Sequence, residues 1–104
     1  MTHIIVLFNL KSDADVAAYE EWARTSDIPA VRRLGSVKRF EVLRMENLLS
    51  GEQETPYQYA ELIEISGLDP FMEDVKSDTI QQAAKQFRTF ADNPKFIVCS
   101  PLDA

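Results

Sequence analysis

Asp27 is the carboxylate whose setting in the sequence best suits chemistry. It lies in the stretch TSDIPAVRRLGSV, two positions before Pro29 and just after a helical pattern that holds the only tryptophan, Trp22. A carboxylate at the mouth of a pocket can act as a general base or acid. Asp27 would equally serve as the N-cap of a helix that begins at Ile28, a role that would lower its pKa. The cap is the simpler interpretation, and the sequence leaves both roles open.

His3 is the second candidate for proton transfer, because histidine is the side chain that ordinarily titrates near neutral pH. It alternates with Ile5, Leu7 and Asn9, a spacing that puts these residues on one face of a strand. The alternative is a frayed residue close to the start of the chain. We therefore expect Asp27 and His3 to be the catalytic candidates.

Aromatic and amide side chains in the expected helices and strands are candidates for substrate binding. The set consists of Trp22, Asn9, Tyr59, Tyr19 and Phe87. Packing in the core explains the aromatic members equally well, whereas a tyrosine hydroxyl could also bind a substrate oxygen. Charged residues of the expected strands are assigned to cross-strand ion pairs or to solvent, namely Arg39, Glu41, Arg44, Glu61 and Glu64.

Composition excludes several classes of function. The 104 residues carry a net charge of −6, whereas nucleic acids and anionic membranes attract basic surfaces. The start of the chain does not have the pattern of a signal peptide, and Cys99 is the only cysteine, so we expect a cytoplasmic protein with a reduced thiol. The sequence shows no zinc spacing, phosphate loop or nucleotide fingerprint, so neither a metal nor a cofactor is expected.

The hydrophobic pattern predicts four strands, over residues 4–10, 36–46, 57–65 and 95–100. Helical patterns cover residues 12–24, 27–35, 69–75 and 77–91. The order is βαββαβ, which is the ferredoxin-like arrangement of an α+β fold. We therefore expect one domain over residues 1–104, with a four-stranded antiparallel sheet and helices on one face.

The first strand is apolar on both faces, which requires cover on both sides of the sheet. We expect the row Ile4, Val6, Phe8 and Leu10 to pack against the sheet of a second copy. The result would be a homodimer in the form of a dimeric α/β barrel. The pocket is then expected between the face that carries His3 and Asn9 and the helices that carry Trp22 and Phe87.

Several stretches resemble a known family in the same order along the chain. They are THIIVLFNLK, YEEWARTSDIPAVRRLGSVKRFEV, LLSGEQETPYQYAELIEI, DPFMEDV and FRTFADNPKFIV. The first is similar to the opening strand of stress-responsive α/β-barrel proteins and of olivetolic acid cyclase. Together the stretches resemble the REDY-like (HapK) family, which is associated with prodigiosin-type pigments and related indole pathways.

This resemblance implies a dimeric α/β barrel that handles small aromatic metabolites. Relatives in the wider superfamily include cofactor-free cyclases, isomerases and monooxygenases, and small-molecule binders. The cyclase branch carries a tyrosine and a histidine on its second helix, and the stretch TIQQAAKQF has neither. His3 does match a pocket histidine of that branch.

Three hypotheses follow. The first is a cofactor-free enzyme of secondary metabolism that cyclises, dehydrates or condenses a pyrrole- or indole-type intermediate by acid–base chemistry. The second is a carrier that binds such a metabolite without turnover. The third is a cofactor-free monooxygenase, which alone of the three would consume oxygen.

Overall fold

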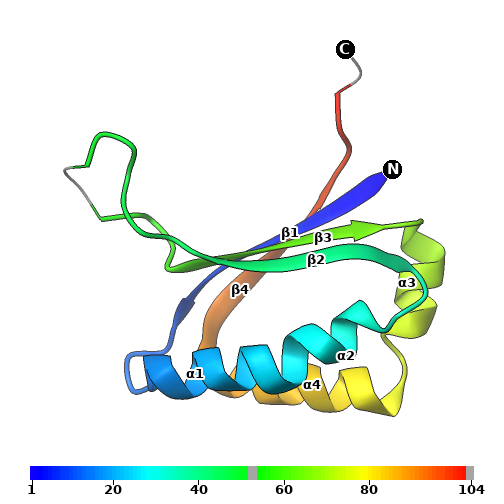
Figure 1. Ribbon diagram of the computed structural model, residues 1–104, viewed down its shortest axis with the longest axis horizontal. Coiled ribbons are helices and arrows are strands. Elements are labelled where there is room, and N and C mark those ends of the chain that lie inside the picture. Colours follow the sequence, from blue (N-terminus) through cyan, green and yellow to red (C-terminus); the bar gives the residue numbers. More distant parts are fainter. Residues whose placement is uncertain (52–53, 103–104) are drawn as a thin grey trace.

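The computed structural model describes residues 1–51 and 54–102 as strands on one side and helices on the other (Figure 1). The elements are, in order, β1 (Thr2–Leu10), α1 (Val16–Trp22), η1 (Ala23–Asp27), α2 (Ile28–Arg32), β2 (Val37–Arg44), β3 (Tyr59–Ile65), α3 (Leu68–Asp74), α4 (Asp78–Phe90) and β4 (Ala91–Cys99). None of the helices in these residues is long and apolar enough to cross a membrane.

The strands form one sheet in the order β2-β3-β1-β4, and every neighbouring pair is antiparallel. β1 thus lies between β3 and β4, as the interleaved halves of a ferredoxin-like fold require. The helices gather on one face of the sheet and leave the other face bare (Figure 1). The predicted α+β fold, a βαββαβ chain with helices on one face, is confirmed.

The face of β1 that packs against the helices is the opposite of the one predicted. The row that we expected to meet a second sheet is buried beneath the helices and consists of Ile4, Val6, Phe8 and Leu10. The ring centroids of Phe8 and Phe87 are 4.9 Å apart, and those of Phe8 and Tyr19 are 5.7 Å apart. Both faces of β1 are apolar, and the bulkier row fills the core.

The bare face of the sheet carries the other residues of β1, which are His3, Ile5, Leu7 and Asn9. On the neighbouring strands it presents Leu62, 37% exposed, and Leu43 and Ile97, both 41% exposed. Aliphatic side chains on all four strands make this a continuous apolar surface. The bare face is therefore the one that a second copy could cover.

A single long helical segment runs from α1 through η1 to α2 (Figure 1). It begins at Asp15, whose Oδ1 accepts hydrogen bonds from the N–H groups of Ala17 at 2.9 Å and Ala18 at 3.3 Å. The helix pattern was expected to begin at Ser12, three residues earlier. The η1 section in its middle is a π-turn, and it is the feature that positions the site described below.

Phe8 lies at the centre of the aromatic core, so we expect Phe8→Ala to cost about 3–5 kcal/mol of unfolding free energy. Phe8 has no exposed surface, and its ring contacts those of Tyr19, Tyr59 and Phe87. Phe96→Ala is the matched control, since Phe96 is 63% exposed and should cost about 1 kcal/mol or less. Urea unfolding followed by circular dichroism would measure both; equal losses would contradict this assignment of the core.

Candidate functional site

Asp27 is held inside the protein by the π-turn η1. The N–H of Ile28 bonds to the carbonyl of Ala23, five residues back rather than four. A turn of this width keeps Tyr19, Ala23 and Asp27, spaced four residues apart, on the buried face of the helix. Pro29 gives a physical reason for the wide turn, because its ring lacks an N–H and clashes with the carbonyl four residues earlier in a regular helix.

The interpretation of Asp27 as an N-cap is wrong. Its backbone is helical, with φ −70° and ψ −55°, and its side chain makes no capping hydrogen bond. Instead Asp27 is only 7% exposed. Burial raises the pKa of its carboxyl to about 6, the opposite of the lowering that a cap would produce.

Glu61 is a second buried carboxylate. It lies on β3 opposite Val6 of β1 and Val42 of β2, and its side chain points toward the helices with 6% of its surface exposed. Burial and the nearby charge of Asp27 raise the pKa of Glu61 to about 8. In residues 1–51 and 54–102, neither carboxylate has a hydrogen-bond donor or a basic side chain as a partner.

Tyr19 adds a third group to this interior. It is fully buried, and its hydroxyl has no hydrogen-bond partner among the described residues. Burial, followed by the charges of Glu61 and Asp27, raises the pKa of the Tyr19 phenol far above its usual range. Tyr19, Asp27 and Glu61 therefore form one electrostatically coupled cluster, called the acid cluster below.

A cavity of about 110 Å³ opens beside the acid cluster, between the long helical segment and the strands β2 and β3. Its lining consists of Tyr19, Glu20, Ala23, Arg24, Ile28, Val42, Arg44 and Tyr59. Ile28 follows Asp27 in the chain, and Val42 pairs with Glu61 across the sheet. The space is the size of a single small ring, and most of its walls are apolar or aromatic.

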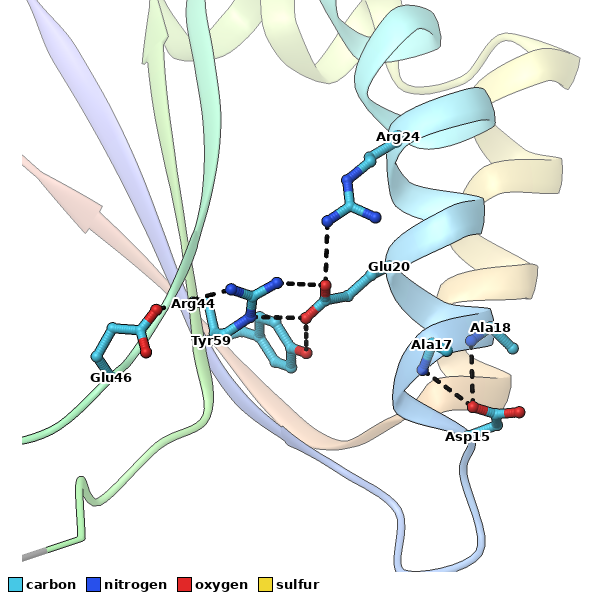
Figure 2. Close-up of polar contacts among 8 residues, drawn as sticks. All are labelled: Asp15, Ala17, Ala18, Glu20, Arg24, Arg44, Glu46 and Tyr59. Atoms are coloured by element: carbon cyan, nitrogen blue, oxygen red, sulfur yellow. Dashed lines mark hydrogen bonds and ion pairs between the residues drawn. The ribbon is translucent and has the colours of Figure 1, made fainter.

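Glu20 lies at the mouth of this cavity, with the exposed side chains of Arg24 and Arg44, and Figure 2 shows its polar contacts. Its carboxylate accepts hydrogen bonds from the Tyr59 hydroxyl at 2.6 Å, from Arg44 Nε at 2.9 Å and from Arg24 at 3.2 Å. Arg44 and Tyr59 together lower the pKa of Glu20 to about 2. These contacts tie helix α1 to the end of β2 and the start of β3.

His3 and Asn9 do not line this cavity, so the predicted pocket between them and the helices is wrong. Both lie on the bare face of the sheet. Asn9 Oδ1 accepts a hydrogen bond from the N–H of Gln58 at 2.9 Å, so Asn9 fixes the start of β3. His3 and Arg39 line a separate hollow of about 320 Å³ on the surface that faces away from the helices.

The aromatic candidates divide into two groups. Tyr19 and Tyr59 line the cavity, with ring centroids 5.0 Å apart. Phe87 is buried in the core against Phe8. Trp22, on the long helical segment, packs against α4, with its ring centroid 5.7 Å from that of Phe90. It does not line the cavity.

Glu61 is the site residue that the sequence analysis assigned wrongly, to an ion pair or to solvent. The signal that would have found it is the period of two along β3. Glu61 alternates with Tyr59, Ile63 and Ile65, and this row is buried throughout. A carboxylate in such a row must face the core.

The residues in and beside the cavity carry carboxyl and phenol groups. Within the part of the chain that the structure describes, no group of three or more His, Cys, Asp or Glu residues is arranged to hold a metal ion. The chemistry available from the side chains themselves is proton transfer and hydrogen bonding.

Comparison with known proteins agrees with this architecture. The family model described as REDY-like protein HapK matches residues 2–102. The crystal structure of HapK from Hahella chejuensis has a TM-score of 0.81 at 27% identity, covering 100% of this chain and 95% of that one. No curated protein matches the sequence.

Two further structures share the fold at lower identity. A variant of SnoaB, a cofactor-independent oxygenase from Streptomyces nogalater, has a TM-score of 0.74 at 15% identity, covering 99% of this chain and 94% of that one. A dimeric ferredoxin-like protein from Thermobifida fusca has a TM-score of 0.77 at 14% identity, covering 96% of this chain and 90% of that one.

The acid cluster should make the protein less stable as the pH rises from about 4.5 to about 8. At the start of this window both carboxyls are still protonated in the folded chain, whereas in the unfolded chain they ionise near their ordinary pKa values of 3.8 and 4.5, so unfolding is favoured increasingly as the pH rises. Urea unfolding at a series of pH values measures the slope, and Glu61→Gln should remove most of it.

Glu73→Gln is the matched control, because Glu73 is exposed and should leave the slope unchanged. Glu20, whose pKa is lowered to about 2, changes its protonation below this pH window and does not affect the slope. Stability that stays constant between these pH values in the parent protein would contradict the burial of unpaired carboxylates.

Proposed function

The chain belongs to the REDY-like HapK family, and from this premise we propose that it is a cofactor-independent enzyme of secondary metabolism that works by acid–base catalysis. Asp27 serves as the base and Glu61 as the acid. The small aromatic substrate enters the cavity beside Tyr19 and Tyr59. The reaction class is a cyclisation, dehydration or condensation.

The observation that carries this proposal is the unpaired carboxylate pair in the interior. With pKa values of about 6 and about 8, Asp27 is largely ionised and Glu61 largely protonated at neutral pH. Because the two groups interact, these values describe the pair as a unit. Two carboxyls whose environments separate their pKa values provide one base and one acid at the same pH. Proton transfer by such groups typically contributes a factor of about 10²–10⁴ to a rate.

The substrate is proposed to be a flat, apolar, pyrrole- or indole-type intermediate of a prodigiosin-like pathway, on the strength of the family resemblance. The cavity supports this choice of shape. Its walls combine the aliphatic side chains Ala23, Ile28 and Val42 with two tyrosine rings. Such walls favour a ring over a charged or strongly hydrated molecule. We place the reaction in the cytoplasm.

Two alternatives use the same cavity. A carrier would bind the aromatic metabolite without changing it. A cofactor-free monooxygenase is the other, suggested by the fold that the chain shares with SnoaB, which is described as a cofactor-independent oxygenase. Product analysis separates the carrier from the enzymes, and oxygen consumption separates the oxygenase from the acid–base enzyme.

Asp27→Asn should lower turnover about a hundredfold or more while the fold remains intact. The amide keeps the shape of the side chain and removes only the group that titrates. The measurement is conversion of candidate pyrrole and indole substrates by the purified variant, with product mass and dissolved oxygen recorded together. Circular dichroism would confirm that the variant is folded.

Asp69→Asn is the control and should keep full activity, because Asp69 is an exposed residue of α3 that does not line the cavity. In the parent enzyme, kcat/KM should rise with pH through about 6 and fall above about 8. Full activity in a folded Asp27→Asn variant would exclude Asp27 as the base.

We also propose that two copies of the single domain, residues 1–104, pair through their bare sheet faces to form a dimeric α/β barrel. A protein with a similar fold, from Thermobifida fusca, is described as dimeric. The apolar surface formed by Ile5, Leu43, Leu62 and Ile97 has no helix over it. A second sheet would remove this surface from water.

Leu62→Asp should dissociate this dimer, because it places a charge on the bare face next to Ile5. The monomer should stay folded, since Leu62 points away from the core. Sedimentation equilibrium at micromolar concentration would measure the mass. Leu49→Asp, at a fully exposed residue outside the sheet, should leave the dimer unchanged. A monomeric parent protein would overturn the barrel proposal.

A further inference from the structure

The hydroxyl of Tyr19 is a buried polar group that the proposed acid–base pair leaves without a role. It is fully buried, yet it has no hydrogen-bond partner among residues 1–51 and 54–102. An unsatisfied buried hydroxyl lowers stability, and removing it should cost the fold nothing. Polar groups buried in this way call for an explanation, and a ligand atom in the adjoining cavity is one.

The ring of Tyr19 cannot turn to find another partner. Aromatic neighbours surround it, with centroid distances of 5.7 Å to Phe8, 5.0 Å to Tyr59, 5.5 Å to Phe90 and 6.2 Å to Trp22. The hydroxyl is therefore fixed in direction before any ligand arrives. A donor that is already oriented stabilises charge that develops on a ligand oxygen without further reorganisation.

The charges around Tyr19 define the kind of ligand that fits. Asp27, Glu61 and Glu20 face it from the helix and from the sheet, and the arginines at the mouth are held by Glu20. An anionic ligand would be repelled by the Asp27 carboxylate. A neutral oxygen acceptor suits a site whose donors, the Tyr19 phenol and the protonated Glu61, carry no charge.

We propose that the substrate is a neutral ring compound in which a ketone or aldehyde lies next to an acidic C–H, and that Tyr19 donates a hydrogen bond to the carbonyl oxygen while Asp27 removes the proton. This rests on the proposed function and specifies its substrate class. Asp27 takes the proton, the electron pair of the C–H bond forms a C=C bond, and the carbonyl oxygen becomes an enolate oxygen. The enolate is stabilised by Tyr19. Returning the proton to carbon regenerates Asp27, and no oxidant or reductant is consumed.

The test uses cyclopentanone, a ketone of a single small ring, and follows exchange of its α-hydrogens in D₂O by NMR. The parent protein should accelerate the exchange. Tyr19→Phe removes one oxygen atom and should slow the protein-catalysed exchange about a hundredfold, the typical effect of losing one oxyanion donor. Its melting temperature should not fall, because the hydroxyl has no partner to lose. Tyr57→Phe, at a tyrosine outside the cavity lining, should exchange like the parent.

A binding measurement gives a second readout that does not depend on turnover. The parent should bind 4-methylphenol more tightly than 1,4-dimethylbenzene, which has nearly the same shape, and Tyr19→Phe should lose this preference. If the two compounds bind equally to the parent, Tyr19 does not recognise an oxygen and the inference is overturned, although Asp27→Asn can still test the proposed function.

A preference for 4-methylphenol without any exchange of cyclopentanone or related ring ketones would overturn the proton-transfer step and favour the carrier. Accelerated exchange that Asp27→Asn abolishes and Tyr19→Phe leaves unchanged would support the base. It would also overturn the role of Tyr19 and would indicate that water is the hydrogen-bond partner of its hydroxyl. The outcomes thus separate the failure of this inference from the failure of the proposed function.

Discussion

The site depends on one constraint: Asp27 and Glu61 are both buried, and no basic side chain among residues 1–51 and 54–102 pairs with either of them. Each buried carboxylate loses its hydration, and together they repel each other when both are ionised. The pair therefore retains one proton at neutral pH, since the pKa is raised to about 6 for Asp27 and to about 8 for Glu61. The surrounding aromatic core must supply the stability that this arrangement costs.

Two local features of the chain create this arrangement. The π-turn before Pro29 keeps Asp27 on the buried face of the helix, in line with Tyr19. The alternation of β3 sends Glu61 to the same side of the sheet as Phe8 and its neighbours. Because the helix and the strand are separate elements, the pair exists only in the folded protein, as is usual for residues that act on a ligand.

The order of the elements could be predicted from the sequence, because strands and helices differ in their hydrophobic period. The face of β1 that forms the core could not, since both rows are apolar and only packing against bulky partners such as Phe87 decides between them. Asp27 was identified, but an aspartate shortly before a proline has the same pattern as a helix cap. A π-turn has no sequence pattern of its own from which the burial of Asp27 could have been predicted. Glu61 could have been found from its apolar row, had the buried side of β3 been followed residue by residue.

The contrast between Glu20 and Glu61 shows that the unpaired interior is not due to a shortage of basic residues. Glu20, at the mouth of the cavity, is bound by Arg44, Arg24 and the hydroxyl of Tyr59, and its pKa falls to about 2. Glu61, on the same strand as Tyr59, receives no such partner, and its pKa rises to about 8. A chain selected for stability alone would gain by pairing or replacing the inner carboxylate, since an unpaired buried charge is costly. The arginines instead pair with Glu20 at the mouth of the cavity, and the interior keeps carboxyl groups with raised pKa values. This division of charge is what the acid–base catalysis proposed above requires.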